Sequence, residues 1–345
     1  MPSPAPDSSA ADAQPVALTA SVRSEFAALL RACGLYDLGS RAQVSVTGSD
    51  RARWLNGMVT NNIRDLAAGS GVYAFLLNPQ GHILADLYAY NCGESLLLDL
   101  DRGLLEKVLP ILDHYIIMDD VELTNLAAEL TTMGLAGPNA QALLRAAGIE
   151  LHTLQPLQFA DVAGKDFNLT VVRTDNQSLE TYELRLAPGN MPALRDALLN
   201  AGAAPVSEPA LELLRIACGI PRYGQDIRER DLPQETEQAR ALHFSKGCYI
   251  GQEIVERIRS RGAVHRKFAG FLIDGPLPSP GMKLQAAGKE VGELTSVATL
   301  PVGMGECAVA LGYVRREVAA PGNQLQAGHA RLTIAAIPFK EVLEH

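Results

Sequence analysis

The stretch Lys246-Gly247-Cys248-Tyr249-Ile250-Gly251-Gln252-Glu253, called the octet below, places one thiol between a lysine, two glycines and an amphipathic pattern. After the octet, Ile254, Val255 and Ile258 follow at helical spacing, which predicts a helix that begins beside Cys248. Backbone N–H groups at a helix N-terminus and the Lys246 ammonium both favour a thiolate. The octet therefore predicts a nucleophilic cysteine, although the same residues also suit a small buried cysteine at a tight turn.

The composition predicts a soluble chain with more than one domain. The chain has 345 residues, of which 47% are hydrophobic, and this length suggests two or three domains. No apolar run reaches the length of about 18 residues that spans a membrane. The formal net charge of -9 argues against a nucleic-acid partner, because such binding depends mainly on basic contacts to phosphate.

The cysteines and the N-terminal segment indicate a reducing compartment. The five cysteines are odd in number, widely spaced and without a CxxC pair, so neither a disulfide framework nor a self-contained zinc site is expected. Residues 1–20 are rich in Ala, Pro, Ser and Asp and lack the features of a targeting signal, so they are predicted to form a disordered tail. We expect a cytoplasmic protein.

The secondary-structure pattern predicts an α+β fold with largely antiparallel sheets. Strand-like runs at 72–78 and 83–90 flank the turn Asn78-Pro79-Gln80-Gly81, which predicts a hairpin. Ser49 is expected to cap a helix that turns Trp54 and Leu55 toward the core. Further strands are expected near 43–47, 95–99, 121–126, 130–135, 168–173 and 182–186, and further helices near 24–33, 103–109, 139–147, 191–200 and 207–219.

The pattern changes after residue 265. Short apolar runs at 268–273, 290–295, 308–314 and 331–337, separated by glycine and proline, predict a small closed β-sheet or barrel. The expected domains are a first α+β domain from 21–136 plus 203–263, a second from 137–202, and the barrel from 264–345.

Several short motifs together resemble the glycine-cleavage T-protein superfamily. They are Leu214-Arg215-Ile216, Gly219-Ile220-Pro221, Gly224-Gln225-Asp226, the octet, and Gly292 followed by Leu294-Thr295-Ser296. The form of the octet is similar to the YgfZ-type branch, whose members bind tetrahydrofolate and support assembly or repair of iron-sulphur clusters. The resemblance runs from about Leu35 onward. It implies two ferredoxin-like domains around a central folate site, with a C-terminal β-barrel.

The same resemblance implies which residues bind the folate. Alternation along the second hairpin strand turns Asp86, Tyr88 and Tyr90 to one face, and Tyr73 on the partner strand can join them. A carboxylate and aromatic rings suit a flat heterocycle with N–H donors. Ordinary tyrosine packing beside a polar residue at a sheet edge explains the same pattern without a ligand.

The folate-binding set also includes Gln252 from the octet and Arg257 from the helix after it, while Cys248 and Lys246 form the reactive set. A basic run follows the octet and suits a folate glutamate tail or an acidic partner, although a solvated loop explains it as well. The run comprises Arg257, Arg259, Arg261, Arg266 and Lys267.

Two departures from the family pattern argue against efficient aminomethyl transfer. Members of the family usually carry two adjacent acids after the first hairpin glycine and read Arg-x-Glu-x-Gly before the proline. Here Asp86 alone remains of the first pair, and Ala217 stands where the glutamate belongs. Asp226 is a candidate replacement. Fewer positioned acids weaken the acid–base catalysis that the transfer needs.

The leading hypothesis is a tetrahydrofolate-binding accessory protein for iron-sulphur client enzymes or cluster-assembly proteins, with Cys248 as the essential contact. Its cofactor is tetrahydrofolate or a one-carbon derivative. Clusters are normally held by about four thiolates, so one cysteine predicts a transient role without a resident metal. The alternatives are a folate-dependent aminomethyltransferase or demethylase, and an interaction module that has lost folate.

Overall fold

The computed structural model describes residues 15–163, 168–262 and 264–344, and these divide into two compact units. Unit 1 contains the residues up to Phe26, Glu208–Glu237, and the residues from Arg257 onward. Unit 2 contains Ala27–Ser207 and Gln238–Glu256. Each unit is therefore assembled from separate stretches of sequence.

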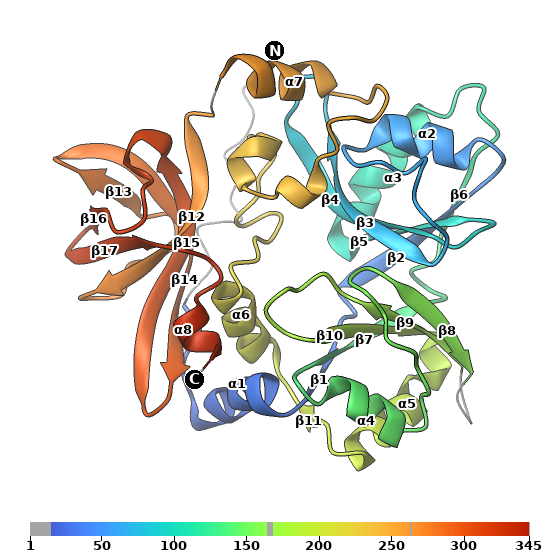
Figure 1. Cartoon of the computed structure of the whole chain (residues 1–345), viewed down its shortest axis with the longest axis horizontal. Helices are drawn as coiled ribbons and strands as arrows, with labels where there is room; N and C mark the ends of the chain where they lie inside the picture. The colour runs from blue at the N-terminus through green and yellow to red at the C-terminus, as the bar shows by residue number, and fades with distance from the viewer. Residues whose placement is uncertain (1–14, 164–167, 263, 345) are drawn as a thin grey trace. The chain divides into compact units, whose positions relative to one another are not determined.

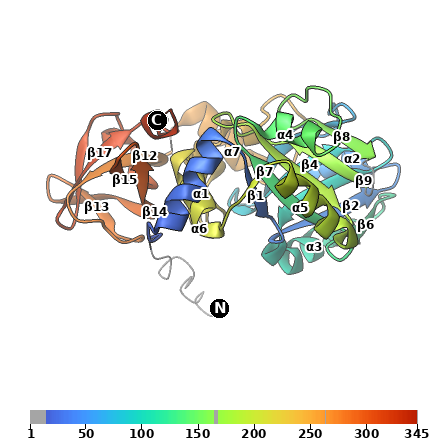
Figure 2. The same ribbon diagram turned by 90° about the horizontal axis from the view of Figure 1, so that it is seen from below.

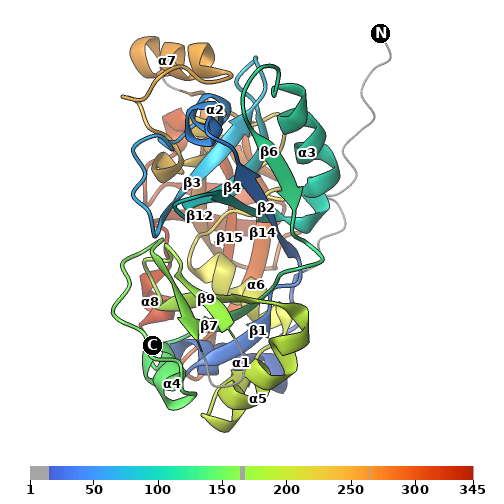
Figure 3. The ribbon, with the colours of Figure 1, turned by 90° about the vertical axis from the view of Figure 1, so that its right-hand side faces the viewer.

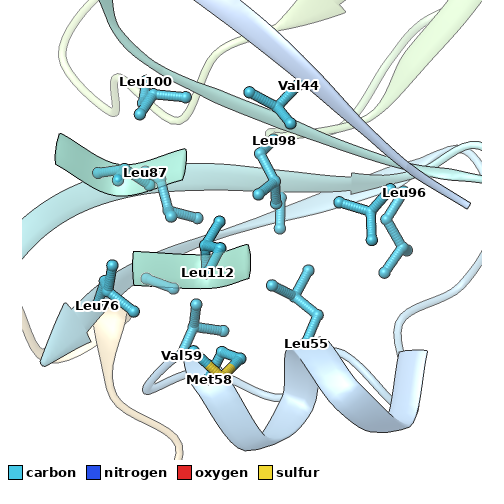
Figure 4. Close-up of a cluster of buried hydrophobic side chains, with 14 of the residues drawn as sticks. Val44, Leu55, Met58, Val59, Leu76, Leu87, Leu96, Leu98, Leu100 and Leu112 are labelled. Carbon is cyan, nitrogen blue, oxygen red and sulfur yellow. The ribbon is translucent and has the colours of Figure 1, made fainter. Parts of the chain in front are cut away.

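The first sheet of unit 2 is antiparallel, with strand order β3-β4-β5-β2-β6. Its strands are β2 (Arg41–Thr47), β3 (Ser70–Leu77), β4 (Ile83–Asn91), β5 (Leu96–Asp101) and β6 (Glu122–Asn125), and its helices are α2 (Arg51–Met58) and α3 (Leu105–His114). Figure 4 shows Leu55 and Met58 of α2 pointing at leucines of the sheet, among them Leu87. The predicted hairpin and the apolar face of the predicted helix are both confirmed.

The second sheet of unit 2 has the order β11-β1-β7-β10-β9-β8. Its strands are β1 (Gly34–Asp37), β7 (Thr131–Ala136), β8 (Phe159–Ala163), β9 (Asn168–Arg173), β10 (Thr181–Leu186) and β11 (Ala204–Pro205). Helices α4 (Ala140–Ala146) and α5 (Met191–Asn200) lie beside this sheet (Figures 2 and 3). Their leucines belong to the same buried cluster as the strands. Strands β1, β7 and β11 complete it from outside 137–202, so those expected domain boundaries cut through one hydrogen-bonded sheet.

Unit 1 contains a closed six-stranded barrel of order β12-β15-β14-β13-β16-β17, which confirms the expected barrel (Figure 1). Its strands are β12 (Arg266–Asp274), β13 (Lys283–Ala286), β14 (Lys289–Val302), β15 (Gly305–Arg315), β16 (Gln324–Ala327) and β17 (Ala330–Ala335). Helix α6 (Glu208–Ala217) lies beside the short α8 (Lys340–Leu343), where the Phe339 N–H donates to the Ala217 carbonyl at 2.9 Å. Stretch 208–237 therefore groups with the barrel rather than with the first α+β domain.

Two helices cross the boundary between the units along the chain: α1 (Ala20–Arg31) and α7 (Gln252–Arg261). Single 3-10 turns complete the structure: η1 (Arg102–Leu104), η2 (Pro188–Asn190), η3 (Pro233–Thr236), η4 (Ala239–Ala241) and η5 (Arg316–Val318). Helix α1 begins at Ala20, at the end of the predicted tail, and residues 1–14 of that tail lie outside the described residues. Within the described part of the chain, none of the helices has the length and apolar character needed to cross a membrane.

The N-terminus of α2 differs from the expectation by one residue. Asp50, not Ser49, is the N-cap, and its side chain makes no capping bond within the helix. The Ser49 hydroxyl instead donates to the Asp120 carboxylate at 2.8 Å, and the Asp120 backbone N–H donates to Asp50 at 3.0 Å. These two hydrogen bonds hold the N-terminus of α2 against the loop at Asp120. Because that loop is about 70 residues away in sequence, a local capping pattern does not reveal the contact.

Candidate functional site

The octet is attached to the turn of the β3–β4 hairpin in unit 2 by two glycines. Gly251 has φ +79°, and a Cβ placed there would lie 2.6 Å from the Asn78 carbonyl oxygen. Gly81, also at positive φ, faces Ile254, whose Cβ would lie 2.8 Å from an added Cβ. Gly251 thus allows close approach of the two backbones, since any larger residue would separate the two turns.

Lys246 holds the start of the octet in place. Its ammonium donates to the backbone carbonyls of Asn56 at 2.5 Å, Val59 at 2.7 Å and Asn61 at 2.6 Å. Burial lowers the pKa of Lys246 to about 7. The three carbonyls favour the charged ammonium and so act to raise the pKa of Lys246, because a neutral amine has only two hydrogens to donate. All three N–H donors are thus used internally, and Lys246 acts as an anchor rather than as a hydrogen-bond donor to Cys248.

Cys248 is exposed, four residues before the start of α7. The residues after it are fixed: Tyr249 is buried, and the Ile250 N–H donates to the Gly57 carbonyl at 3.1 Å. The thiol therefore stands in solvent on a rigid turn, which excludes the alternative of a buried packing cysteine. Cys218, the other cysteine near the motifs, is buried in unit 1.

The predicted aromatic face exists on the β3–β4 hairpin. Tyr73 pairs with Tyr88 across the two strands, and Tyr90 lies opposite Gly71, where an added Cβ would collide with the Tyr90 ring. The Tyr73 hydroxyl donates to Asp86 Oδ2 at 2.9 Å. Ring centroids lie 5.0 Å apart for Tyr73 and Tyr88, and 6.3 Å apart for Tyr88 and Tyr90. These residues form one continuous surface, called the tyrosine face below.

A ligand can reach two members of this face. Asp86 and Tyr88 are half-buried, whereas Tyr73 and Tyr90 are 4% and 2% exposed and so support their neighbours. Burial raises the pKa of Asp86, while Arg41 and the Tyr73 hydroxyl act in the opposite direction. Burial also raises the pKa of Tyr88, so its hydroxyl remains a donor at neutral pH. The reachable part combines a carboxylate acceptor with a phenol.

Two arginines contact the rings of this face. The guanidinium carbon of Arg240 lies 4.4 Å from the Tyr73 ring centroid, and that of Arg185 lies 4.4 Å from the Tyr90 centroid. Arg240 forms an ion pair with Asp175, which accepts the Tyr88 hydroxyl at 3.1 Å. Cation–π contacts of this kind are worth about 0.5–2 kcal/mol. Arg240 and Asp175 therefore lock the hydroxyl of Tyr88.

A buried ionic group lies beside this face, because Asp99 of β5 is the cross-strand partner of Tyr88. Asp99 is fully buried and accepts from Arg41 Nε at 2.6 Å, from Gln43 at 2.8 Å, and pairs with Arg185 at 3.0 Å. Burial acts to raise the pKa of Asp99, but Arg41 and Arg185 hold it below its usual value. A buried network in which charges are paired fixes side-chain directions. Here it fixes Arg41 and Arg185, whose guanidinium groups lie over the rings of Tyr88 and Tyr90.

Three other site predictions have different outcomes. The Gln252 carbonyl oxygen accepts from the Tyr249 N–H at 3.2 Å, so part of this amide is used within the octet. Arg257 is exposed on α7. Asp226, the suggested replacement acid, is fully buried in unit 1 and bonded to Arg215 at 2.6 Å and Ser296 at 2.7 Å. Its carboxylate is enclosed by these partners, so the suggestion that it replaces the missing glutamate is wrong.

The basic run does not form one surface. Arg257 and Arg259 are exposed on α7, whereas Arg266 begins β12 and pairs with Asp231 at 2.6 Å and Glu235 at 3.1 Å. The side chain of Arg261 lies outside the described residues. Sequence reasoning missed Arg240 and Asp175 because they lie in a 3-10 turn and a loop, 65 residues apart, with no local pattern that marks them.

Two protein families match this chain. Residues 11–246 match the family described as GCVT N-terminal domain, and residues 259–339 match the CAF17 C-terminal beta-barrel domain. An aminomethyltransferase from Rubrobacter xylanophilus is 30% identical over 302 residues, which cover 86% of this chain and 80% of that protein. A putative chloroplastic transferase from Arabidopsis thaliana is 25% identical, over 85% of this chain and 67% of that protein.

A solved structure shares the fold. The crystal structure of glycine cleavage system aminomethyltransferase T from Bartonella henselae matches with a TM-score of 0.83 at 23% identity, covering 93% of this chain and 90% of that one. This likeness and the strand topology confirm the expected α+β architecture with two sheets and a C-terminal barrel.

Proposed function

We propose a function from the premise that this chain belongs to the GCVT family, whose N-terminal domain its residues 11–246 match. The protein binds tetrahydrofolate or a one-carbon derivative, and through exposed Cys248 it supports iron-sulphur client enzymes or their assembly proteins. The single observation that carries this proposal is a solvent-exposed thiol on a turn that is fixed by Lys246 and Gly251.

The tyrosine face fits a reduced folate. Asp86 Oδ2 accepts from Tyr73, which leaves the other carboxylate oxygen for the N–H groups of a pterin. The half-buried ring of Tyr88 offers an aromatic surface to a flat heterocycle. The names of the aminomethyltransferase relatives and the family match support the same ligand class. Asp86 and Tyr88 would bind and orient the folate, while Tyr73 and Tyr90 hold them.

The octet supports a contact role for Cys248. Fixed neighbours mean that the thiol approaches a partner without ordering a loop, which lowers the entropic cost of association. Among the described residues, no three His, Cys, Asp or Glu side chains are arranged to hold a metal ion. An iron-sulphur cluster enters this proposal as cargo or as part of a client. The match of residues 259–339 to the CAF17 barrel supports the YgfZ-type branch.

A cysteine comparison in the native host tests the role of the thiol. Cys248→Ala is compared with Cys92→Ala, since Cys92 is the other exposed cysteine. We expect Cys248→Ala to reduce the activities of iron-sulphur enzymes several-fold with an unchanged Tm, and Cys92→Ala to have no effect. Equal activities in the two strains would overturn the proposal.

A folate titration tests the tyrosine face separately. Tetrahydrofolate and its formyl derivative are titrated into the purified protein, Asp86→Asn, and Asp196→Asn as an exposed acidic control on α5. We expect Asp86→Asn to weaken binding about tenfold or more, since a hydrogen bond to a charged group is lost. Binding that is the same in all three proteins would remove Asp86 from the site.

Aminomethyl transfer is the second candidate function, and the names of the relatives favour it. The purified protein is incubated with an aminomethyl-lipoyl donor and tetrahydrofolate, and methylene-tetrahydrofolate is measured. We expect no turnover at catalytic rates, because Ala217 replaces one acid and Asp226 is enclosed. Turnover above about 1 per second, the low end of ordinary enzyme rates, would establish the transferase instead.

A further inference from the structure

A cavity of about 350 Å³ lies in unit 1, at the barrel. None of its lining residues belongs to the tyrosine face, which is part of unit 2. Strands β12, β13, β14 and β15 and the loop before η3 supply its walls. Its cationic lining residues are Arg230, Arg266, Lys283 and Arg315, and its acidic ones are Glu290 and Glu293. Four cations thus face two carboxylates in a chain whose formal net charge is -9.

The carboxylates at the cavity are shared among several cations. A single carboxylate, Glu293, is shared by Arg228 at 2.6 Å, Arg230 at 2.9 Å and Lys283 at 2.9 Å. Burial acts to raise the pKa of Glu293, but Lys283 and Arg228 hold it below its usual value. One carboxylate cannot accept from all the N–H donors of three cations, so donors remain for an incoming anion.

The cations differ in how firmly they are held. Arg266 is fixed by Asp231 and Glu235, and its guanidinium carbon lies 4.6 Å from the Tyr313 ring centroid. Lys283 and Arg315 are more than half exposed, and Arg315 lies 3.8 Å from the exposed Glu317. Exposed ion pairs contribute about 0–1 kcal/mol, so these two side chains can turn toward a ligand at little cost.

Tyr313 gives an independent indication of a ligand. It lines the cavity and is 1% exposed, yet its hydroxyl has no hydrogen-bond partner among the described residues. A buried hydroxyl without a partner is unfavourable by about 1–3 kcal/mol. Burial and the nearby carboxylate of Asp231 raise the pKa of Tyr313, so the phenol stays protonated and can donate. An acceptor atom inside the cavity would satisfy it.

We propose that this cavity is a binding site for a small, multiply charged oxyanion, held by Arg230, Arg266, Lys283 and Arg315 and by a hydrogen bond from the Tyr313 hydroxyl. Guanidinium groups bind phosphate and carboxylate oxygens through paired N–H bonds, and the phenol adds one neutral donor. The volume admits a compact ligand such as a phosphorylated metabolite or a polycarboxylate. Glu290 is 59% exposed and turns to solvent when the anion replaces it beside Lys283.

Calorimetric titrations of the full chain with inorganic pyrophosphate, citrate and sulfate test the site. The variants are Arg315→Gln and Tyr313→Phe, and the matched control is Arg316→Gln, which removes the same charge one residue outside the cavity lining. We expect saturable binding of pyrophosphate or citrate that weakens about tenfold in Arg315→Gln and about threefold in Tyr313→Phe. Arg316→Gln should bind as the natural protein does.

The two polyanions separate the possible ligand sources. Tighter binding of pyrophosphate than of citrate assigns a phosphorylated ligand, and the reverse order assigns a polycarboxylate. Equal weakening in Arg315→Gln and Arg316→Gln would indicate only general attraction between charges and would overturn the proposal. So would the absence of saturable binding of all three anions at millimolar concentrations. Asp86→Asn leaves these titrations unchanged, so the result is independent of the folate site.

Discussion

The two faces of the β3–β4 hairpin are built from alternate residues of the same strands and differ completely in composition. On one face Ala85, Leu87 and Ala89 join the apolar core of the first sheet, in which Leu87 is labelled in Figure 4. On the other, Asp86 accepts from the Tyr73 hydroxyl, and the guanidinium carbon of Arg41 lies 5.9 Å from the Tyr88 ring centroid. The apolar face supplies the free energy of burial, while the polar face concentrates charge and hydroxyl groups that add little of it.

This difference separates stability from ligand binding along a single strand. Consecutive residues of the strand lie on opposite faces. Substitutions on the apolar face should change the free energy of unfolding, and substitutions on the polar face should change the Kd for folate. The octet repeats the pattern at shorter range, because Lys246 is buried and fully bonded whereas Cys248 is exposed. Four substitutions test the separation, in decreasing order of their expected effect on the free energy of unfolding.

Leu87→Ala should have the largest effect. Leu87 is 1% exposed within the apolar core, and truncation of such a leucine destabilises a protein by about 2–5 kcal/mol. Urea denaturation would show this loss, while the tetrahydrofolate Kd of the remaining folded protein stays unchanged. A large increase in that Kd, at a temperature where the variant is folded, would contradict the separation of the two faces.

Lys246→Met should destabilise the protein by roughly 3 kcal/mol. The substitution leaves three buried backbone carbonyls without their donor, at about 1–3 kcal/mol each, but it also removes the unfavourable burial of an ammonium group, which offsets part of this loss. Cys248→Ala, two residues away, should change the free energy of unfolding by less than about 0.5 kcal/mol, as is usual for an exposed position. Similar losses in the two variants, measured by denaturation, would contradict the assignment of Lys246 as the anchor.

Tyr73→Phe should have a smaller effect of about 1 kcal/mol, the net contribution of one hydrogen bond. The ring and its contact with Arg240 remain, so the fold is retained. Because the lost hydroxyl helps to keep Asp86 ionised, the pKa of Asp86 should rise further and folate binding should weaken at mildly acidic pH. A pH series of folate titrations measures this, and an unchanged series argues against coupling between the two residues.

Asp86→Asn should have the smallest effect on stability. Unlike the other three substitutions, it should stabilise the protein. Burial raises the pKa of Asp86, so the folded protein binds more protons than the unfolded chain above the ordinary carboxyl pKa of 3.8. Ionised Asp86 therefore lowers the stability at neutral pH. The variant should be slightly more stable at pH 7.5, with an advantage that shrinks as the pH falls toward 4. A lower Tm for the variant at pH 7.5 would contradict this.

The sequence predicted those features whose signals are local. The hairpin was readable because Asn78-Pro79-Gln80-Gly81 separates two alternating runs, and alternation placed Asp86, Tyr88 and Tyr90 on one face. The turn at Cys248 followed from the glycines and the helical spacing after them, whereas the sequence left open whether the thiol is exposed or buried. In each case a few consecutive residues determine the geometry, and tertiary packing did not override it.

Other features depend on pairing between distant segments. Strand β13 holds one fully buried side chain, Leu284, and is recognisable only through its ladder with β14. Strand β1 joins the second sheet through β7, about 100 residues later, which no local pattern indicates. For the same reason the sequence assigned Lys246 to the thiol, since the carbonyls that occupy its ammonium lie about 185–190 residues earlier.

The interleaving of the two units has a consequence for synthesis on the ribosome. Both sheets of unit 2 and its octet lie within the first 256 residues, so this unit can close before translation ends. Unit 1 begins before Ala27 and finishes with β17 and α8, so helix α6 and the stretch after it must wait for the emerging barrel. During that interval the apolar side of α6 lacks its final cover, and exposed apolar surface of this kind favours aggregation of a nascent chain.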